Sequence, residues 1–212
     1  KAIKAYEQAL ARNPRNAVIL ASLARLHAAP GSLNSPKKAL EYAKDAHAAA
    51  PGDASISQLL GHLAYESGDY KWAASLLRDA ALKLPDQPAV FYDLALSCYG
   101  LGQLPAAEAA MQNVLKGASA FDQADEAKRF LSLLLAYRDP AQRAAVVSQL
   151  PDVLKADPNY IPALMVNQLL QQEKGDFQTA RKTLDHVLTI NPLFVPAMRD
   201  LAILCFDRFP GE

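Results

Sequence analysis

The stretch that decides the fold is PGDASISQLLGHLAYESGDYKWAASLLRDAALKLP, residues 51–85. Apolar and small side chains recur in it at helical spacing, first at Leu60, Gly61 and Ala64 and then at Ala73, Leu77 and Ala80. Gly68 and Asp69 separate the two segments, and Pro85 ends the second. The stretch therefore predicts two amphipathic helices joined by a tight turn, with Asp69 capping the second helix.

A helical hairpin of this length cannot bury its own apolar stripe, so neighbouring hairpins must cover it. Small residues at Gly61 and Ala64 let two helices approach closely, while Leu60 and Leu77 fill the space between them. We therefore expect the hairpin to recur along the chain.

Copies do recur at a regular spacing. Pro85 lies 34 residues after Pro51, and Pro192 lies 34 residues after Pro158. An insert of three residues within 28–36 lengthens an earlier copy, and another copy ends at Ser119 where proline would be expected. Residues 122–160 are a divergent copy, in which Asp139 is placed as an N-cap and Pro140 as the first residue of a second helix that ends at Pro158.

The recurring pattern resembles the tetratricopeptide repeat (TPR), which has Leu-Gly in its first helix and Ala-x3-Phe followed by Pro in its second. The resemblance implies an all-α, right-handed α-α superhelical solenoid of stacked helical hairpins, with about twelve helices. We expect one solenoid, a fragment of a longer protein, in which Gly68, Gly102 and Gly175 lie in turns between paired helices. The expected units are a half repeat at 1–16, repeats at 17–53, 54–87, 88–121, 122–160 and 161–194, and a half repeat at 195–212.

Charge and hydropathy disfavour several partners. Lysine plus arginine equals aspartate plus glutamate at 22 each, and no basic run appears, so neither nucleic acid nor an anionic membrane surface is expected as a partner. No apolar run approaches the roughly 18 residues needed to cross a bilayer. The compartment stays open between the cytoplasm and the bacterial periplasm or envelope.

Motifs that carry chemistry are absent from the sequence. The four histidines are scattered without metal-ligand spacing, and there is no glycine-rich phosphate loop, nucleophile elbow or paired-cysteine motif. We therefore expect no enzymatic activity, no metal and no cofactor.

In the resembled family the first helices line a concave groove that binds peptides. Exposed aromatic side chains there can anchor a partner at low entropic cost. The alternative for Tyr65 and Tyr99, which end their helices, is packing against the neighbouring repeat. The predicted groove residues are His62, Tyr65, Tyr92, Leu96, Tyr99, Arg25, Met165 and Leu169, and the same repeat positions also fall on Gln172, Arg199 and Ile203.

One subtype of the family grips the C-terminal carboxylate of chaperone tails with Lys and Asn in its first repeat and with Lys and Arg in its third. Here Arg25 stands where the first Asn would, Ala21 replaces the Lys, and Ala89 and Asp93 occupy the third-repeat positions. The sequence therefore disfavours a chaperone-tail adaptor and favours an apolar or mixed peptide.

We accordingly predict a protein-interaction scaffold whose partner is a protein or peptide. Two alternatives are a non-catalytic arm of a larger enzyme, such as a glycosyltransferase, and a bacterial envelope or secretion scaffold. Self-association is also expected, through apolar side chains that lack a neighbouring repeat at the two ends, namely Ile3, Tyr6, Leu10, Ile203, Leu204 and Phe206.

One position departs from the repeat pattern. Asn167 occupies a place that leucine holds in most other copies, and Gln168 replaces the small residue beside it. An unpaired buried amide would cost about 1–3 kcal/mol. We therefore predict that Asn167 is buried with its amide hydrogen-bonded.

Overall fold

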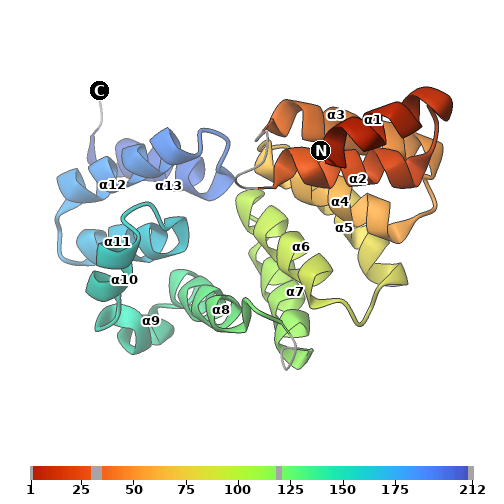
Figure 1. The fold of residues 1–212 in the computed structure, drawn as a ribbon. Helices are drawn as coiled ribbons and strands as arrows, with labels where there is room; N and C mark the ends of the chain where they lie inside the picture. The colour runs from red at the N-terminus through yellow and green to blue at the C-terminus, as the bar shows by residue number, and fades with distance from the viewer. Residues whose placement is uncertain (1, 30–34, 118–120, 210–212) are drawn as a thin grey trace. The chain divides into compact units, whose positions relative to one another are not determined.

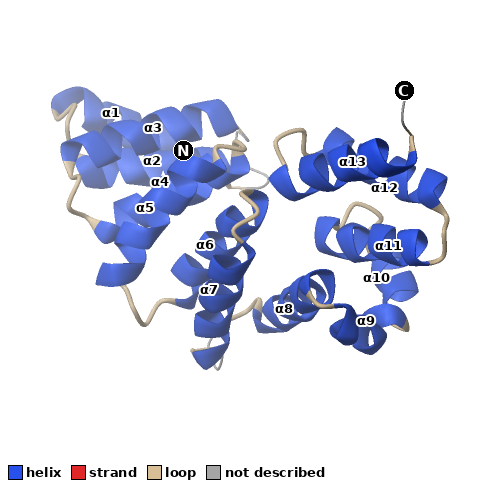
Figure 2. Cartoon of the chain, turned by 180° about the vertical axis from the view of Figure 1, so that it is seen from behind, coloured by secondary structure: helices blue, strands red, loops and turns tan. Residues whose placement is uncertain are grey.

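The computed structural model describes residues 2–29, 35–117 and 121–209, which form thirteen helices and no strand (Figures 1 and 2). Residues 30–34 of the predicted insert, and Ser119, lie outside the described residues. The chain has an all-α helical repeat fold, as predicted. Its contacts group it into two compact units, Lys1–Ser97 and Cys98–Glu212. The repeat boundaries and the single solenoid stay predictions.

The first unit holds five helices and part of a sixth. Each helix is 11 to 14 residues long, as expected for the two arms of a short hairpin. The helices are α1 (Ala2–Arg12), α2 (Ala17–Ala28), α3 (Pro36–Ala49), α4 (Ala54–Glu66), α5 (Tyr70–Lys83) and α6 (Pro88–Gly100), the last of which continues into the second unit.

The second unit continues the same alternation of helices and turns. Its helices are α7 (Leu104–Lys116), α8 (Ala124–Arg138), α9 (Pro140–Val147), α10 (Leu150–Ala156), α11 (Ile161–Glu173), α12 (Phe177–Ile190) and α13 (Val195–Arg208).

A helix cap, buried leucines and a glycine contact stabilise the α4–α5 hairpin. The side chain of Asp69 accepts a hydrogen bond from the backbone N–H of Trp72 at 3.0 Å, which confirms the predicted cap. Leu60 and Leu77 are buried between the helices. A β-carbon on Gly61 would lie 2.6 Å from Cγ of Leu77, so the close approach of α4 and α5 requires glycine there.

The predicted glycine turns are confirmed. Gly68, Gly102 and Gly175 have φ angles of 83°, 72° and 77°, and they lie between α4 and α5, α6 and α7, and α11 and α12. This left-handed conformation ends a helix and is unfavourable for residues with a β-carbon.

The divergent segment differs from the expectation by one helix. A single second helix was predicted to run to Pro158, but it is divided into α9 and α10 at Ser148 and Gln149. Pro151 lies in the first turn of α10, where its missing N–H and its ring are tolerated; a continuous helix would place them in its interior. Asp139 caps α9 as predicted, accepting a hydrogen bond from the N–H of Ala141 at 2.9 Å.

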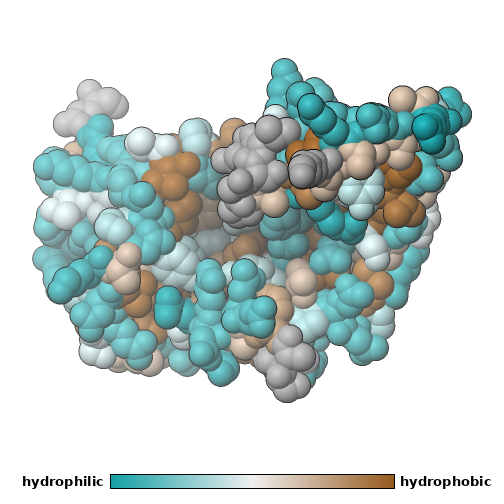
Figure 3. All heavy atoms as spheres, viewed as in Figure 1, coloured by the Kyte–Doolittle hydropathy of each residue, from teal (hydrophilic) through white to brown (hydrophobic). Residues whose placement is uncertain are grey.

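Helix α13 carries exposed apolar surface, which Figure 3 shows as a brown area over that helix. Ile203 and Phe206 are exposed there, as predicted for that end, but Leu204 is buried, which corrects the prediction for that residue. At the other end Tyr6 is exposed, whereas Ile3 and Leu10 are half-buried. Self-association through these faces stays a prediction.

Candidate functional site

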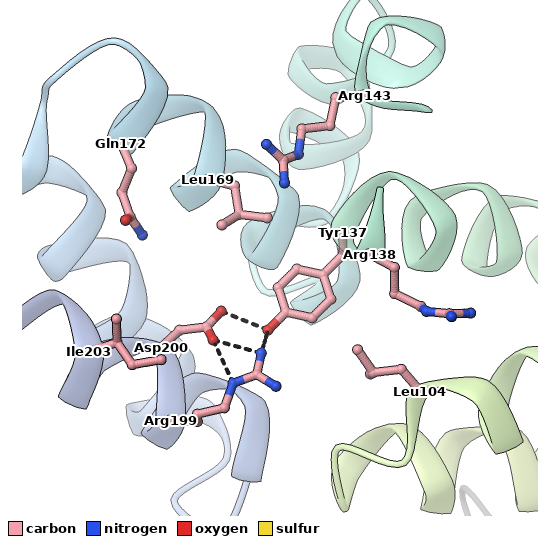
Figure 4. A pocket seen from close by; sticks show the side chains of 9 residues that line it. All are labelled: Leu104, Tyr137, Arg138, Arg143, Leu169, Gln172, Arg199, Asp200 and Ile203. Atoms are coloured by element: carbon pink, nitrogen blue, oxygen red, sulfur yellow. Dashed lines mark hydrogen bonds and ion pairs between the residues drawn. The ribbon is translucent and has the colours of Figure 1, made fainter. Parts of the chain in front are cut away.

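The second unit contains a cavity of about 400 Å³ on its first helices (Figure 4). Cavities of this size are in the range that holds ligands. Helices α8, α11 and α13 supply most of the wall, and α7 and α9 complete it. We call it the arginine pocket, and it is lined by Leu104, Tyr137, Arg138, Arg143, Leu169, Gln172, Arg199, Asp200 and Ile203.

Asp200 is the centre of a hydrogen-bond network in this pocket. Its Oδ2 accepts from the Tyr137 hydroxyl at 2.6 Å and from Nε2 of Gln168 at 3.1 Å. Its Oδ1 accepts from Nε and Nη2 of Arg199 at 3.0 and 2.8 Å. These four bonds use the acceptor capacity of the carboxylate and connect helices α8, α11 and α13.

The same network fixes the protonation of its members. Burial raises the pKa of the Tyr137 phenol well above its ordinary value, and the charge of Asp200 raises that pKa further. Tyr137 therefore stays protonated, and its hydroxyl donates a hydrogen bond to Asp200. The hydroxyl oxygen accepts a hydrogen bond from Nη2 of Arg199 at 2.7 Å. The hydrogen bond to Asp200 also raises the pKa of the Arg199 guanidinium, which stays charged.

Two further arginines reach the pocket from other helices. Arg138 forms an ion pair with Glu108, and Arg143 forms one with Glu173. Nε of Arg143 also donates to the carbonyl oxygen of Ala136 at 3.1 Å. In Figure 4 the guanidinium groups of Arg143 and Arg199 approach from different sides, with the side chain of Leu169 between their helices.

A second cavity, of about 330 Å³, adjoins the arginine pocket. The two share Arg143, Leu169, Gln172 and Ile203, so they form one continuous groove. The second cavity continues along the walls of Glu173, Phe177, Leu204, Asp207 and Arg208.

Four of the groove-lining residues are at positions mapped from the repeat pattern. Leu169 was predicted as a site residue and lines both cavities, and the mapped positions Gln172, Arg199 and Ile203 lie beside it. Tyr137, Arg138, Arg143 and Asp200 were missed. The first three lie at a helix end and in a second helix of the divergent segment, where the repeat pattern is weakest, and Asp200 lies outside the mapped positions.

Several other predicted groove residues are packed in the interior. Met165 is fully buried, which corrects its assignment to an open groove wall, because α11 is covered there by neighbouring helices. Tyr92 is also buried. Tyr99 is buried with its ring centroid 5.1 Å from those of Phe130 and Phe194, so it makes the packing contact considered as the alternative.

The remaining predicted residues lie in the first unit. Arg25 and His62 are exposed, while Tyr65 and Leu96 are half-buried. Tyr65 packs against Tyr70 of α5, within its own predicted repeat, at 5.7 Å between ring centroids. Nδ1 of His62 lies 3.1 Å from Oδ1 of Asp93. No described cavity gathers these four residues.

Histidine 62 provides a pH-dependent test of this contact. The hydrogen bond to Asp93 raises the pKa of His62, and the charges of Asp93 and Glu66 act in the same direction against desolvation. Because the folded state favours protonated His62, this residue stabilises the fold fully below about pH 6.5. The stabilisation is lost as the pH rises through the folded-state pKa of His62. We expect an NMR titration midpoint above 6.5 that falls in Asp93→Asn. A midpoint at or below 6.5 in the parent chain would contradict the contact.

The predicted buried amide is at the neighbouring residue. Asn167 is only half-buried, whereas Gln168 is fully buried and donates to Asp200, so the prediction for Asn167 is wrong. Gln168 lies 24 residues before Pro192, as Gly61 lies 24 before Pro85. Its amide oxygen accepts from Nε2 of Gln172 at 2.5 Å. Where one repeat has glycine, this repeat has a side chain that reaches from α11 to Asp200 on α13.

The described residues offer neither a metal-ligand cluster nor a membrane-spanning helix. No group of three or more histidine, cysteine or acidic side chains is arranged there to hold a metal ion. None of the described helices combines the length and apolarity needed to span a membrane.

Comparison with known proteins agrees with this architecture. Residues 59–123 match the family model described as tetratricopeptide repeat. Among curated proteins, none matches the chain.

Two solved structures share the fold over most of their length. One is YrrB, described as a TPR protein with an unusual peptide-binding site, with a TM-score of 0.57 and 22% identity over 93% of this chain and 98% of that chain. The other is MamA, with a TM-score of 0.50 and 19% identity over 89% of this chain and 85% of that chain.

Proposed function

This chain is a tetratricopeptide repeat protein, as its fold and the family match over residues 59–123 indicate. We propose that it binds an extended segment of another protein in the groove of its second unit. Proteins of this fold are protein-interaction scaffolds. The proposal therefore concerns which surface of this chain makes the contact.

The observation that carries the proposal is the continuity of the two cavities. Their volumes are about 400 and 330 Å³, and they share the apolar residues Leu169 and Ile203. An extended peptide places successive side chains on alternate sides, so adjoining cavities suit a strand-like segment better than a single small molecule. The peptide-binding site attributed to YrrB supports the use of this fold for such a ligand.

The chemistry of the groove favours binding over catalysis. Asp200 is the one acidic residue that lines the arginine pocket, and its carboxylate oxygens accept four hydrogen bonds. A general base must be free to take a proton from its substrate. We therefore assign the arginine pocket to recognition and not to general-base catalysis.

The test is a matched pair of substitutions measured against peptides selected from a random peptide display library on the full chain. Ile203 is 54% exposed on the groove, and Leu82 is 82% exposed on the second helix α5. Ile203→Asp is expected to weaken a selected peptide about thirtyfold, the effect of losing a central anchor. Leu82→Asp should leave the affinity unchanged, and both variants should keep the parent's circular dichroism spectrum.

Two results would contradict this function. One is a display selection that yields no binding peptide. The other is a selected peptide whose affinity is unaffected by Ile203→Asp but lost in Leu82→Asp, which would move the contact to the second helices of the first unit.

A further inference from the structure

We propose that the arginine pocket selects a segment with an acidic side chain next to an apolar one, and that Arg199 binds the carboxylate. This inference rests on the proposed function, because it requires that the groove receives a peptide. It adds the chemical class of the residue that the groove recognises.

The position of Arg199 is fixed before any ligand binds. Its Nε and Nη2 donate to Oδ1 of Asp200, and Nη2 also donates to the Tyr137 hydroxyl. Among the residues that the structure describes, Nη1 has no hydrogen-bond partner, and the side chain is 51% exposed. A guanidinium held along one edge offers its remaining donors in a set direction, which reduces the entropy lost on binding.

Asp200 cannot serve as a competing acceptor for a basic ligand. All four of its acceptor sites are occupied by donors from the protein, and its side chain is only 11% exposed. A lysine or arginine of a partner would have to displace one of these bonds. A ligand carboxylate would need no such displacement, because it can accept hydrogen bonds from Nη1 of Arg199.

The donors left on the other two arginines also favour an acidic ligand. Arg138 and Arg143 are ion-paired with Glu108 and Glu173, and Glu173 lines the adjoining cavity. Each of those ion pairs uses Nη1 of its arginine and leaves donors on Nη2. A ligand carboxylate can accept from these donors, whereas a ligand cation cannot.

The rest of the wall supplies the apolar half of the recognition. Leu169 and Ile203 are on the same helices as Gln172 and Arg199 and line the pocket beside them. Leu104 lies on the wall formed by α7. An aliphatic side chain next to the acidic one can therefore be covered while the carboxylate reaches Arg199.

This site is separate from the carboxylate-binding positions of the chaperone-tail subtype. Those positions fall on Ala21, Arg25, Ala89 and Asp93, all in the first unit. Arg199 is in the second unit, with Tyr137 and Gln168 from other helices fixing its partner Asp200.

The experiment uses the full chain and four pools of labelled synthetic nonapeptides, each with leucine next to a fixed central residue and random residues elsewhere. The fixed residue is glutamate, glutamine, lysine or phosphoserine, and binding is followed by fluorescence anisotropy. We expect the glutamate pool to bind about tenfold more tightly than the glutamine pool, as for the loss of a charged hydrogen bond. Arg199→Gln should abolish this preference, and Arg199→Lys should keep part of it because lysine retains the charge without the fork.

The control is Arg15→Gln, which removes an exposed arginine of the first unit and should leave the preference unchanged. If no pool binds, both the proposed function and this inference fail. If the pools bind without a glutamate preference, or Arg199→Gln keeps it, the function stands and the inference is overturned. Tighter binding of the phosphoserine pool would overturn the assignment to a carboxylate.

Discussion

Phe130→Ala is expected to lower the free energy of unfolding by about 3–5 kcal/mol, the range for removing a fully buried aromatic side chain. Phe130 is 1% exposed in the second unit. Its ring meets Tyr99 at 5.1 Å with an interplanar angle of 84°, an edge-to-face pair that adds to the packing. The loss follows from the cavity left beside Tyr99.

Phe206→Ala is the matched control, because Phe206 is 83% exposed in the same unit. Its removal should change the free energy of unfolding by less than about 0.5 kcal/mol. Urea denaturation followed by far-ultraviolet circular dichroism measures both variants. Equal effects of the two substitutions would mean that the ring of Phe130 does not form part of the core.

Asp200→Ala is expected to cost about 2–3 kcal/mol, because it leaves donors on three helices without their shared acceptor. The hydroxyl of Tyr137 and the amide of Gln168 are buried and would keep no replacement partner of equal strength. Arg199 is half-exposed, so water can compensate it in part. Asp185→Ala, on an exposed carboxylate of α12, should change the stability by less than about 0.5 kcal/mol.

A double-mutant cycle separates the network from the effect of the substitution alone. Tyr137→Phe removes the 2.6 Å hydrogen bond and keeps the ring. If Asp200 and Tyr137 interact as described, the double variant should lose less than the sum of the single losses, by at least about 0.5 kcal/mol. Additive losses, measured by the same urea denaturation, would contradict the network.

These two stability tests also bear on recognition. The network that supports α8, α11 and α13 is the same one that holds Arg199 at the pocket. A change that loosens it is expected to lower stability and peptide affinity together. Ile203→Asp acts on an exposed side chain outside the network and should alter the affinity alone, whereas Arg199→Gln also removes hydrogen bonds to Asp200 and Tyr137 and should lower the stability as well.

The sequence by itself determined the local structure. The helical spacing of apolar residues, the caps at Asp69 and Asp139, and the glycine turns predicted the hairpins, and the structure shows them. Gly61 also gave the close contact of α4 with α5. These features depend on neighbours within one helical hairpin, so their physical causes can be read from a short stretch of sequence.

The tertiary structure decided which side chains are buried and which converge. Repeat positions placed Met165 on the groove and Asn167 in the core, whereas Met165 is buried and Gln168 carries the buried amide. Helical periodicity assigns a residue to a face, but each helix packs against several others, and their crossing determines how much of that face is covered. Tyr137 and Asp200 are 63 residues apart in sequence, and only the packing of α8 and α13 brings them together in the arginine pocket.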